Sequence, residues 1–267
     1  MQATILPMSA GWGWILQGYA LFRRQPMAML FWSVTTSFLI NIGSLIPILG
    51  QVALVALTPL LTFLTLCACR NLERNIRMLP SLWLQPIKGT GVARPLLRLG
   101  LAYLGATFTA AAIATMLFWS QLLATLERQA DKPDYAALSQ AMTGPLIVFG
   151  LFYVVISALF WHTPALVGWH RLSLRRALFY SMVACWRNKL PIVAYVASWA
   201  ALYFGFHWLI EQLAAAGVAG ATLGWIALPV DILITALLYC SFYPIYTTIF
   251  KAPQTSDSAA DQPGELQ

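Results

Sequence analysis

The residues best suited to chemistry in this sequence are polar side chains that interrupt long apolar stretches. Asp231 is the acid that lies inside such a stretch, within Leu-Pro-Val-Asp-Ile. An ionised carboxylate is costly in hydrocarbon, so acids at membrane depth usually face a cavity, an ion path or a proton relay. A structural alternative is that a helix begins after Pro229, which would make Asp231 its N-cap near the outer interface. From the sequence, both interpretations stay open.

The three histidines are weaker candidates. His207 and Glu211 are four residues apart and would share one helix face, where they can pair or remain solvated at the interface. His162 and His170 are eight residues apart, with no carboxylate or cysteine between them. Zinc sites in proteins need several such ligands at close spacing. We therefore expect no metal site and no cofactor.

Asn41 and the cysteines have structural interpretations. Asn41 falls within the first apolar run, where amide side chains commonly hydrogen-bond between helices. Cys67 and Cys69 flank a single alanine and therefore lack the two-residue spacing of redox and zinc motifs. The sequence also contains no G-x-x-x-x-G-K-[ST], G-x-S-x-G or H-E-x-x-H motif. We therefore expect a protein that is not an enzyme.

Basic residues followed by proline mark three junctions in the chain. The junctions are Arg23-Arg24-Gln25-Pro26, Arg94-Pro95 and Arg187-Asn188-Lys189-Leu190-Pro191. A basic side chain anchors in the headgroup layer and proline is tolerated in the first turn of a helix, so each junction predicts an entry into a membrane. The candidate contacts to anionic lipid headgroups are Arg23, Arg24, Arg175, Arg176, Arg187 and Lys189.

The elements that position these residues are predicted by composition. Of 267 residues, 60% are hydrophobic and 9% charged, whereas a typical soluble domain has about 45–50% apolar and about 25% charged residues. A spanning helix needs about 20 apolar residues, and the sequence predicts an all-α membrane protein with six of them. The predicted spans are 27–49, 52–69, 99–123, 145–167, 190–210 and 223–250. They form one membrane domain over residues 1–251, and residues 252–267 are predicted to be a disordered tail.

The distribution of Lys and Arg predicts the orientation. Of the 16 basic residues, only Arg128 and Lys132 fall on the side of the loop predicted at 124–143, which is otherwise acidic. Because the basic excess stays in the cytoplasm, both termini are expected to be cytoplasmic. The net charge of +7 is thus mainly a topology signal. Nucleic-acid binding would require a basic face free of lipid, so we expect none.

Amphipathic segments before the spans indicate a repeated unit. Ser173 to Lys189 has an apolar stripe opposite Arg176 and Arg187, with Ser173 as its expected N-cap. Ser9 to Arg24 has a similar stripe weakened by three glycines, and Pro80 to Arg94 contains breakers that exclude a continuous helix. Three copies of an amphipathic helix plus two spans is one interpretation. Two duplicated halves, or junctions that arose independently, are the alternatives.

Two parts of the chain carry a resemblance to known proteins. Residues 13–26, together with 164–167 and 177–188, resemble a family of uncharacterised bacterial inner-membrane proteins. The scheme of interfacial helix, basic residue and span is more distantly similar to the membrane domain attached to some glycerophosphodiester phosphodiesterases. The resemblance implies six spans and assigns no functional residue. The catalytic domain of those phosphodiesterases has no counterpart here.

Two functions are compatible with these patterns. The first is a non-enzymatic membrane protein whose basic amphipathic helices organise lipids, especially anionic lipids, or partner proteins. The alternative is a small-molecule transporter or channel-like protein with Asp231 and the proline-broken spans near its pathway. Partner proteins and oligomeric state are not indicated by the sequence.

Overall fold

The computed structural model describes residues 3–89, 91–131 and 135–250, and these ranges contain helices and no strand. Six segments are long and apolar enough to span a membrane. They are α2 (Pro26–Leu45), α3 (Leu49–Glu73), α4 (Ala93–Leu117), α6 (Tyr135–Phe160) continued by α7 (Thr163–His170), α9 (Lys189–Ala215) and α10 (Gly220–Phe250). The prediction of an all-α membrane protein with six spans is confirmed.

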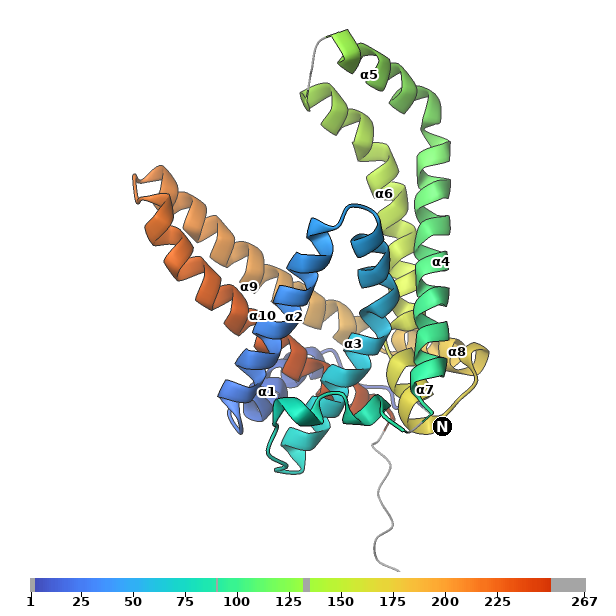
Figure 1. Cartoon of the computed structure of the whole chain (residues 1–267), viewed down its shortest axis with the longest axis vertical. Helices are drawn as coiled ribbons and strands as arrows, with labels where there is room; N and C mark the ends of the chain where they lie inside the picture. The colour runs from blue at the N-terminus through green and yellow to red at the C-terminus, as the bar shows by residue number, and fades with distance from the viewer. Residues whose placement is uncertain (1–2, 90, 132–134, 251–267) are drawn as a thin grey trace, which may run out of the picture.

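The spans form three hairpins that diverge from a common base (Figure 1). The hairpins are α2–α3, α4–α6 and α9–α10, and α5 (Trp119–Asp131) joins α4 to α6 at the far end. The base contains α1 (Ala10–Phe22), α8 (Leu174–Arg187) and the two 3-10 turns η1 (Pro80–Leu82) and η2 (Gln85–Ile87). Each hairpin therefore follows a short amphipathic or irregular segment, which is the order that the three-unit interpretation predicts.

The connection between the third and fourth spans differs from the prediction, because the helices extend beyond the apolar stretches. The loop predicted at 124–143 is largely helical, because α5 continues to Asp131 and α6 already begins at Tyr135. Hydropathy shows only where an apolar stretch ends. The helix can continue past that point into water when its side chains there are polar. Residues 132–134 and the predicted tail at 252–267 lie outside the described residues.

Glycines in α1 allow close packing against the third hairpin. A Cβ atom on Gly18 would lie 2.7 Å from the Cα of Ser241, and one on Gly11 would collide with the backbone carbonyl of Pro191. The glycines that lower helix propensity are thus contact points, as is common where membrane helices approach closely. The predicted apolar stripe of α1 lies mostly on the opposite side, where Trp12 and Leu16 face away from the protein.

Glycines also occur at close contacts between other spans. Gly100 on α4 lies against the carbonyl of Ala56 on α3, and Gly168 on α7 lies against the ring of Phe63. Any side chain at these glycines would push the helices apart. Apolar side chains gain little by leaving lipid for protein, so this close backbone approach is a main source of helix association in a membrane.

Helix α8 is amphipathic as predicted, with two corrections. Its buried side consists of Ala177, Ser181, Ala184 and Cys185. Trp186, which helical periodicity assigns to the apolar stripe, is 70% exposed, because it lies one position beyond the face that packs against the hairpins. Ser173 occupies the N-cap position but its side chain makes no capping hydrogen bond.

A buried amide ties the N-terminal segment to the base. Asn188, at the junction of α8 and α9, is fully buried. Its Nδ2 donates to the carbonyl of Thr4 at 2.9 Å, and its Oδ1 accepts from the N–H of Leu6 at 2.9 Å. The N–H of Thr4 also donates to the carbonyl of Ile249 near the end of α10. Both ends of the described chain therefore lie at the base.

Candidate functional site

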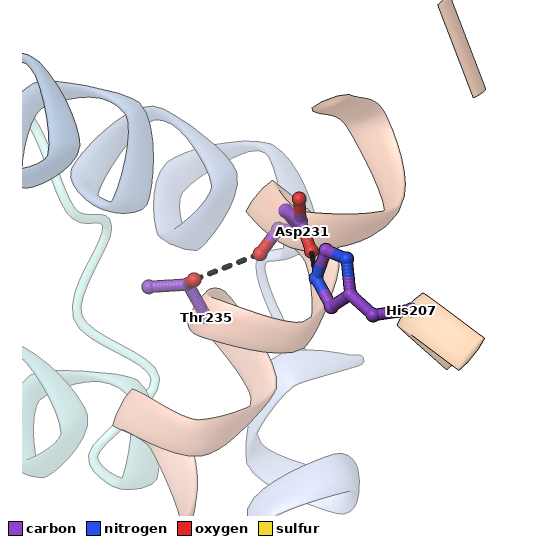
Figure 2. Close-up of polar contacts among 3 residues, drawn as sticks. All are labelled: His207, Asp231 and Thr235. Carbon is purple, nitrogen blue, oxygen red and sulfur yellow. Dashed lines mark hydrogen bonds and ion pairs between the residues drawn. The ribbon is translucent and has the colours of Figure 1, made fainter. Parts of the chain in front are cut away.

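Asp231 forms a side-chain pair between the two helices of the third hairpin. Figure 2 shows His207 reaching from α9 toward Asp231 on α10, with Nε2 and Oδ1 3.1 Å apart. The hydroxyl of Thr235 donates to the backbone carbonyl of Asp231 at 2.7 Å. Asp231 lies eleven residues after Gly220, well inside α10. The N-cap interpretation is wrong, because α10 continues through Pro229.

The surroundings of this pair are apolar but not closed. The side chains of His207 and Asp231 are 33% and 38% exposed. At a rise of about 1.5 Å per residue, each lies about 28 Å along its helix from the base. The ring of Tyr203 packs on His207 at a centroid distance of 4.4 Å. An ionisable pair inside an apolar helical hairpin is unusual, because polar groups at membrane depth are costly.

Of the two interpretations open for His207 and Glu211, the pairing does not form. His207 bonds to Asp231 instead, and Glu211 is exposed on α9. The sequence could not indicate the actual partner, because the two residues are 24 positions apart. Their pairing depends on how α9 and α10 pack. The polar character of both residues in apolar runs was the available signal.

Asn41 does not bridge helices. Its side-chain amide donates to the carbonyl of Ser37 within α2 at 2.8 Å, and the residue is exposed. An amide with no polar partner on a neighbouring helix bonds back to its own backbone. The interhelical role predicted for Asn41 is therefore wrong.

The candidate headgroup contacts fall into two groups. Arg24 is engaged with the protein, since its Nη1 donates to the carbonyl of Glu73 at 2.7 Å at the end of α3. Arg23 is exposed and lies over the ring of Tyr19 at 5.8 Å. Arg24 thus caps carbonyl groups at the C-terminus of α3, where the helix dipole favours cations. Arg23 is directed outward.

The basic residues of α8 are directed outward too. Arg175, Arg176 and Arg187 are exposed and form no hydrogen bond or ion pair with other described residues. Lys189 lies with Nζ 5.0 Å from the ring centre of Trp186. On the opposite face, burial raises the pKa of the Cys185 thiol to about 12. One face of α8 is therefore buried against the protein, and the other is exposed and cationic.

A cavity of about 530 Å³ lies between the hairpins. It is bounded by α2, α3, α4, α6, α7 and α10, and its wall is largely apolar. Hydroxyl groups interrupt this wall, among them Thr62 and Ser157, and the hydroxyls of Tyr103 and Tyr153 are 3.1 Å apart. Asp231 is not part of the lining. No sequence pattern indicates this cavity, because it forms only where the three hairpins diverge.

Metal chemistry finds no support among the described residues. No group of three His, Cys, Asp or Glu side chains lies close enough to hold an ion. Within the same ranges, Cys67, Cys69, Cys185 and Cys240 are all buried free thiols. The packing role predicted for the Cys67 and Cys69 pair agrees with this burial.

Comparison with known proteins places the chain among bacterial membrane proteins. It is 31% identical over 270 residues to a probable inner membrane protein of Burkholderia thailandensis, covering 96% of this chain and 100% of that protein. No family model matches the chain, and no solved structure matches it. These comparisons provide no link to glycerophosphodiester phosphodiesterases. The alignment covers all six spans, and the chain therefore belongs to the family of this inner membrane protein.

Proposed function

We propose that the protein is a non-enzymatic membrane protein that organises anionic lipids at the cytoplasmic surface of the inner membrane. The observation that carries this proposal is the two-sided character of α8. Its inner face is buried against the hairpins, while Arg175, Arg176 and Arg187 extend away from the protein without partners among the described residues. Each basic residue near an anionic surface contributes about 1 kcal/mol.

The proposal includes an orientation in which the base faces the cytoplasm. Both ends of the described chain lie at the base, where Thr4 bonds to Ile249. Helices α1 and α8 both lie at this base (Figure 1), and basic residues occur in α8 and directly after the end of α1. Because Lys and Arg are retained on the cytoplasmic side, this arrangement supports cytoplasmic termini.

Lipid analysis of the purified full-length protein tests the proposed role. The protein and a variant with Arg175→Gln, Arg176→Gln and Arg187→Gln would be extracted in mild detergent from membranes that contain phosphatidylglycerol and phosphatidylethanolamine. We expect the wild type to retain an excess of phosphatidylglycerol and the variant to lose it. A control with Arg77→Gln, an exposed arginine outside α8, should resemble the wild type. Equal lipid composition in wild type and triple variant would reject the proposal.

A second candidate, a proton-coupled transporter, is favoured by the pair formed by His207 and Asp231. Ionisable groups inside spans are rare and commonly mark substrate pathways, ion pathways or proton relays. The test is substrate or proton flux in vesicles with Asp231→Asn, which removes the titratable group and keeps the shape. Unchanged flux and growth would favour the lipid-organising role.

A further inference from the structure

A small polar pocket lies at the base, next to the large cavity. It has a volume of about 90 Å³ and is lined by ends of α3, α7 and α10. Tyr246 lines both this pocket and the 530 Å³ cavity. A hydrogen bond of 2.7 Å between Tyr246 Oη and His170 Nε2 fixes the phenol at the boundary. A cationic compartment and an apolar compartment thus share one wall.

Among the described residues, the two arginines of the polar pocket have no ion-pair partner. Arg70 and Arg74 both line it, and no carboxylate of a described residue lies within 4.0 Å of either guanidinium. Glu73 also lines the pocket, but its carboxylate accepts a hydrogen bond of 2.5 Å from the hydroxyl of Tyr243. Arg70 is held in place over the ring of Trp169 at 5.3 Å. An anion would satisfy the two arginines.

The large cavity has the shape of a channel for a chain-like group. Along α3 its lining runs from Leu54 to Leu66, a length of about 18 Å at 1.5 Å per residue. Its volume falls within the range of about 300–1,000 Å³ that is typical of small-molecule sites. At the end near Tyr246 it reaches His162, a fully buried residue whose Nε2 has no hydrogen-bond partner. A buried polar atom without a partner is rare in folded proteins and suggests a missing ligand group.

We propose that the two compartments form one binding site for a single-chain anionic amphiphile, a fatty acid or lysophospholipid. The acyl chain occupies the cavity between the hairpins, and the head group lies against Arg70 and Arg74. Tyr246 contacts the junction of head and chain, with His162 beside it. This inference deepens the proposed lipid role, but it depends on residues of α3, α7 and α10 and not on the surface of α8.

Photo-crosslinking with a palmitic acid that carries a diazirine and an alkyne tests the site in the full-length protein in vesicles. We expect labelled peptides from α3, α6 or α10, and competition by palmitate and by lysophosphatidylglycerol. Inorganic phosphate and glycerol phosphate should not compete, because they lack the chain. The palmityl alcohol probe should label about tenfold less at equal concentration, since it lacks the charge that the arginines bind.

Variants test the contributions of the cavity and of the polar pocket to labelling separately. Ser157→Trp and Thr62→Phe, which fill the cavity, should each abolish labelling by the acid probe, whereas Val154→Trp on the exposed side of α6 should not. The double change Arg70→Gln and Arg74→Gln should reduce labelling by the acid to the level of the alcohol. Size-exclusion profiles identify any variant that fails to fold, and two cavity variants are used for that reason.

Labelling that persists in folded Ser157→Trp and Thr62→Phe, or that maps only to lipid-facing peptides, would overturn the proposal. Equal labelling by acid and alcohol probes would remove the role of the arginines. The α8 variant with three glutamines should keep normal crosslinking. Unchanged lipid enrichment in that variant would reject the α8 proposal and leave the cavity site standing. Labelling that persists in the folded cavity-filling variants would reject the cavity site and leave the α8 proposal standing.

Discussion

The Oδ1 atom of Asn188 accepts a hydrogen bond of 2.9 Å from the backbone N–H of Leu6, 182 positions earlier in the chain. The same side chain donates to Thr4 and to Ala184. This buried amide therefore joins the N-terminal segment, α8 and α9 at one point.

Asn188→Ala should destabilise the protein by about 1–3 kcal/mol, because it leaves partly buried backbone groups of Thr4 and Leu6 without these partners. The expected readout is a lower midpoint in a thermal aggregation assay in detergent. Asn41→Ala is the matched control, since Asn41 is exposed and bonds only within its own helix. It should shift the midpoint little. Equal shifts for both variants would contradict the assigned role of Asn188.

Gly18→Ala should weaken the packing of α1 on α10. The added Cβ would lie 2.7–2.8 Å from backbone and side-chain atoms of Ser241, so the helices must separate. Gly13→Ala is the control, because its Cβ would meet only the end of Gln17 at 3.9 Å. We expect Gly13→Ala to be stabilising by up to about 1 kcal/mol through helix propensity, and Gly18→Ala to be destabilising. Thermal stability of both purified variants checks the opposite signs.

His207 and Asp231 should show energetic coupling. We expect His207→Gln and Asp231→Asn each to lower stability. The double variant should lose less than the sum of the two, with a coupling of about 0.6 kcal/mol, typical of interhelical polar pairs in membranes. The measurement is a double-mutant cycle based on reversible unfolding in mixed micelles. Strictly additive effects would show that the contact of 3.1 Å contributes nothing to stability.

Cys185 should resist thiol reagents over an ordinary pH range. Burial raises the pKa of its thiol to about 12 from an ordinary value of 9.0, so the reactive thiolate is scarce below pH of about 9. Because the folded-state pKa lies above the unfolded value, the neutral thiol favours folding at low pH. This contribution is lost as the pH rises from about 9 to about 12. Maleimide labelling of a variant that retains only Cys185 should therefore be slow at neutral pH and rise steeply above pH of about 9.

The sequence predicted the membrane helices well because span length and hydropathy reflect one dominant cost, that of polar groups in lipid. Arg176 and Arg187 were placed correctly on the outer face of α8, because helical periodicity depends only on neighbouring residues. The breaks at Pro86 and Gly89 also followed from local backbone chemistry, and the structure has two short 3-10 turns in that region.

What the sequence could not predict depends on contacts between distant helices. The pairing of His207 with Asp231, the buried position of Asn188 and the shared wall at Tyr246 all require knowledge of how the hairpins are arranged. The sequence left open whether the last helix begins before or after Pro229, because neighbouring helices can satisfy the backbone groups that proline leaves free. The structure has one helix from Gly220 to Phe250.

The orientation of the base is the central claim, and reporter fusions test it most directly. Alkaline phosphatase, which is active only in the periplasm, would be fused after Gln267 in one protein and inserted at Gly217, in the turn between α9 and α10, in another. We predict an inactive enzyme at Gln267 and an active one at Gly217. Activity at Gln267 with none at Gly217 would place the basic face of α8 outside the cytoplasm and contradict the account.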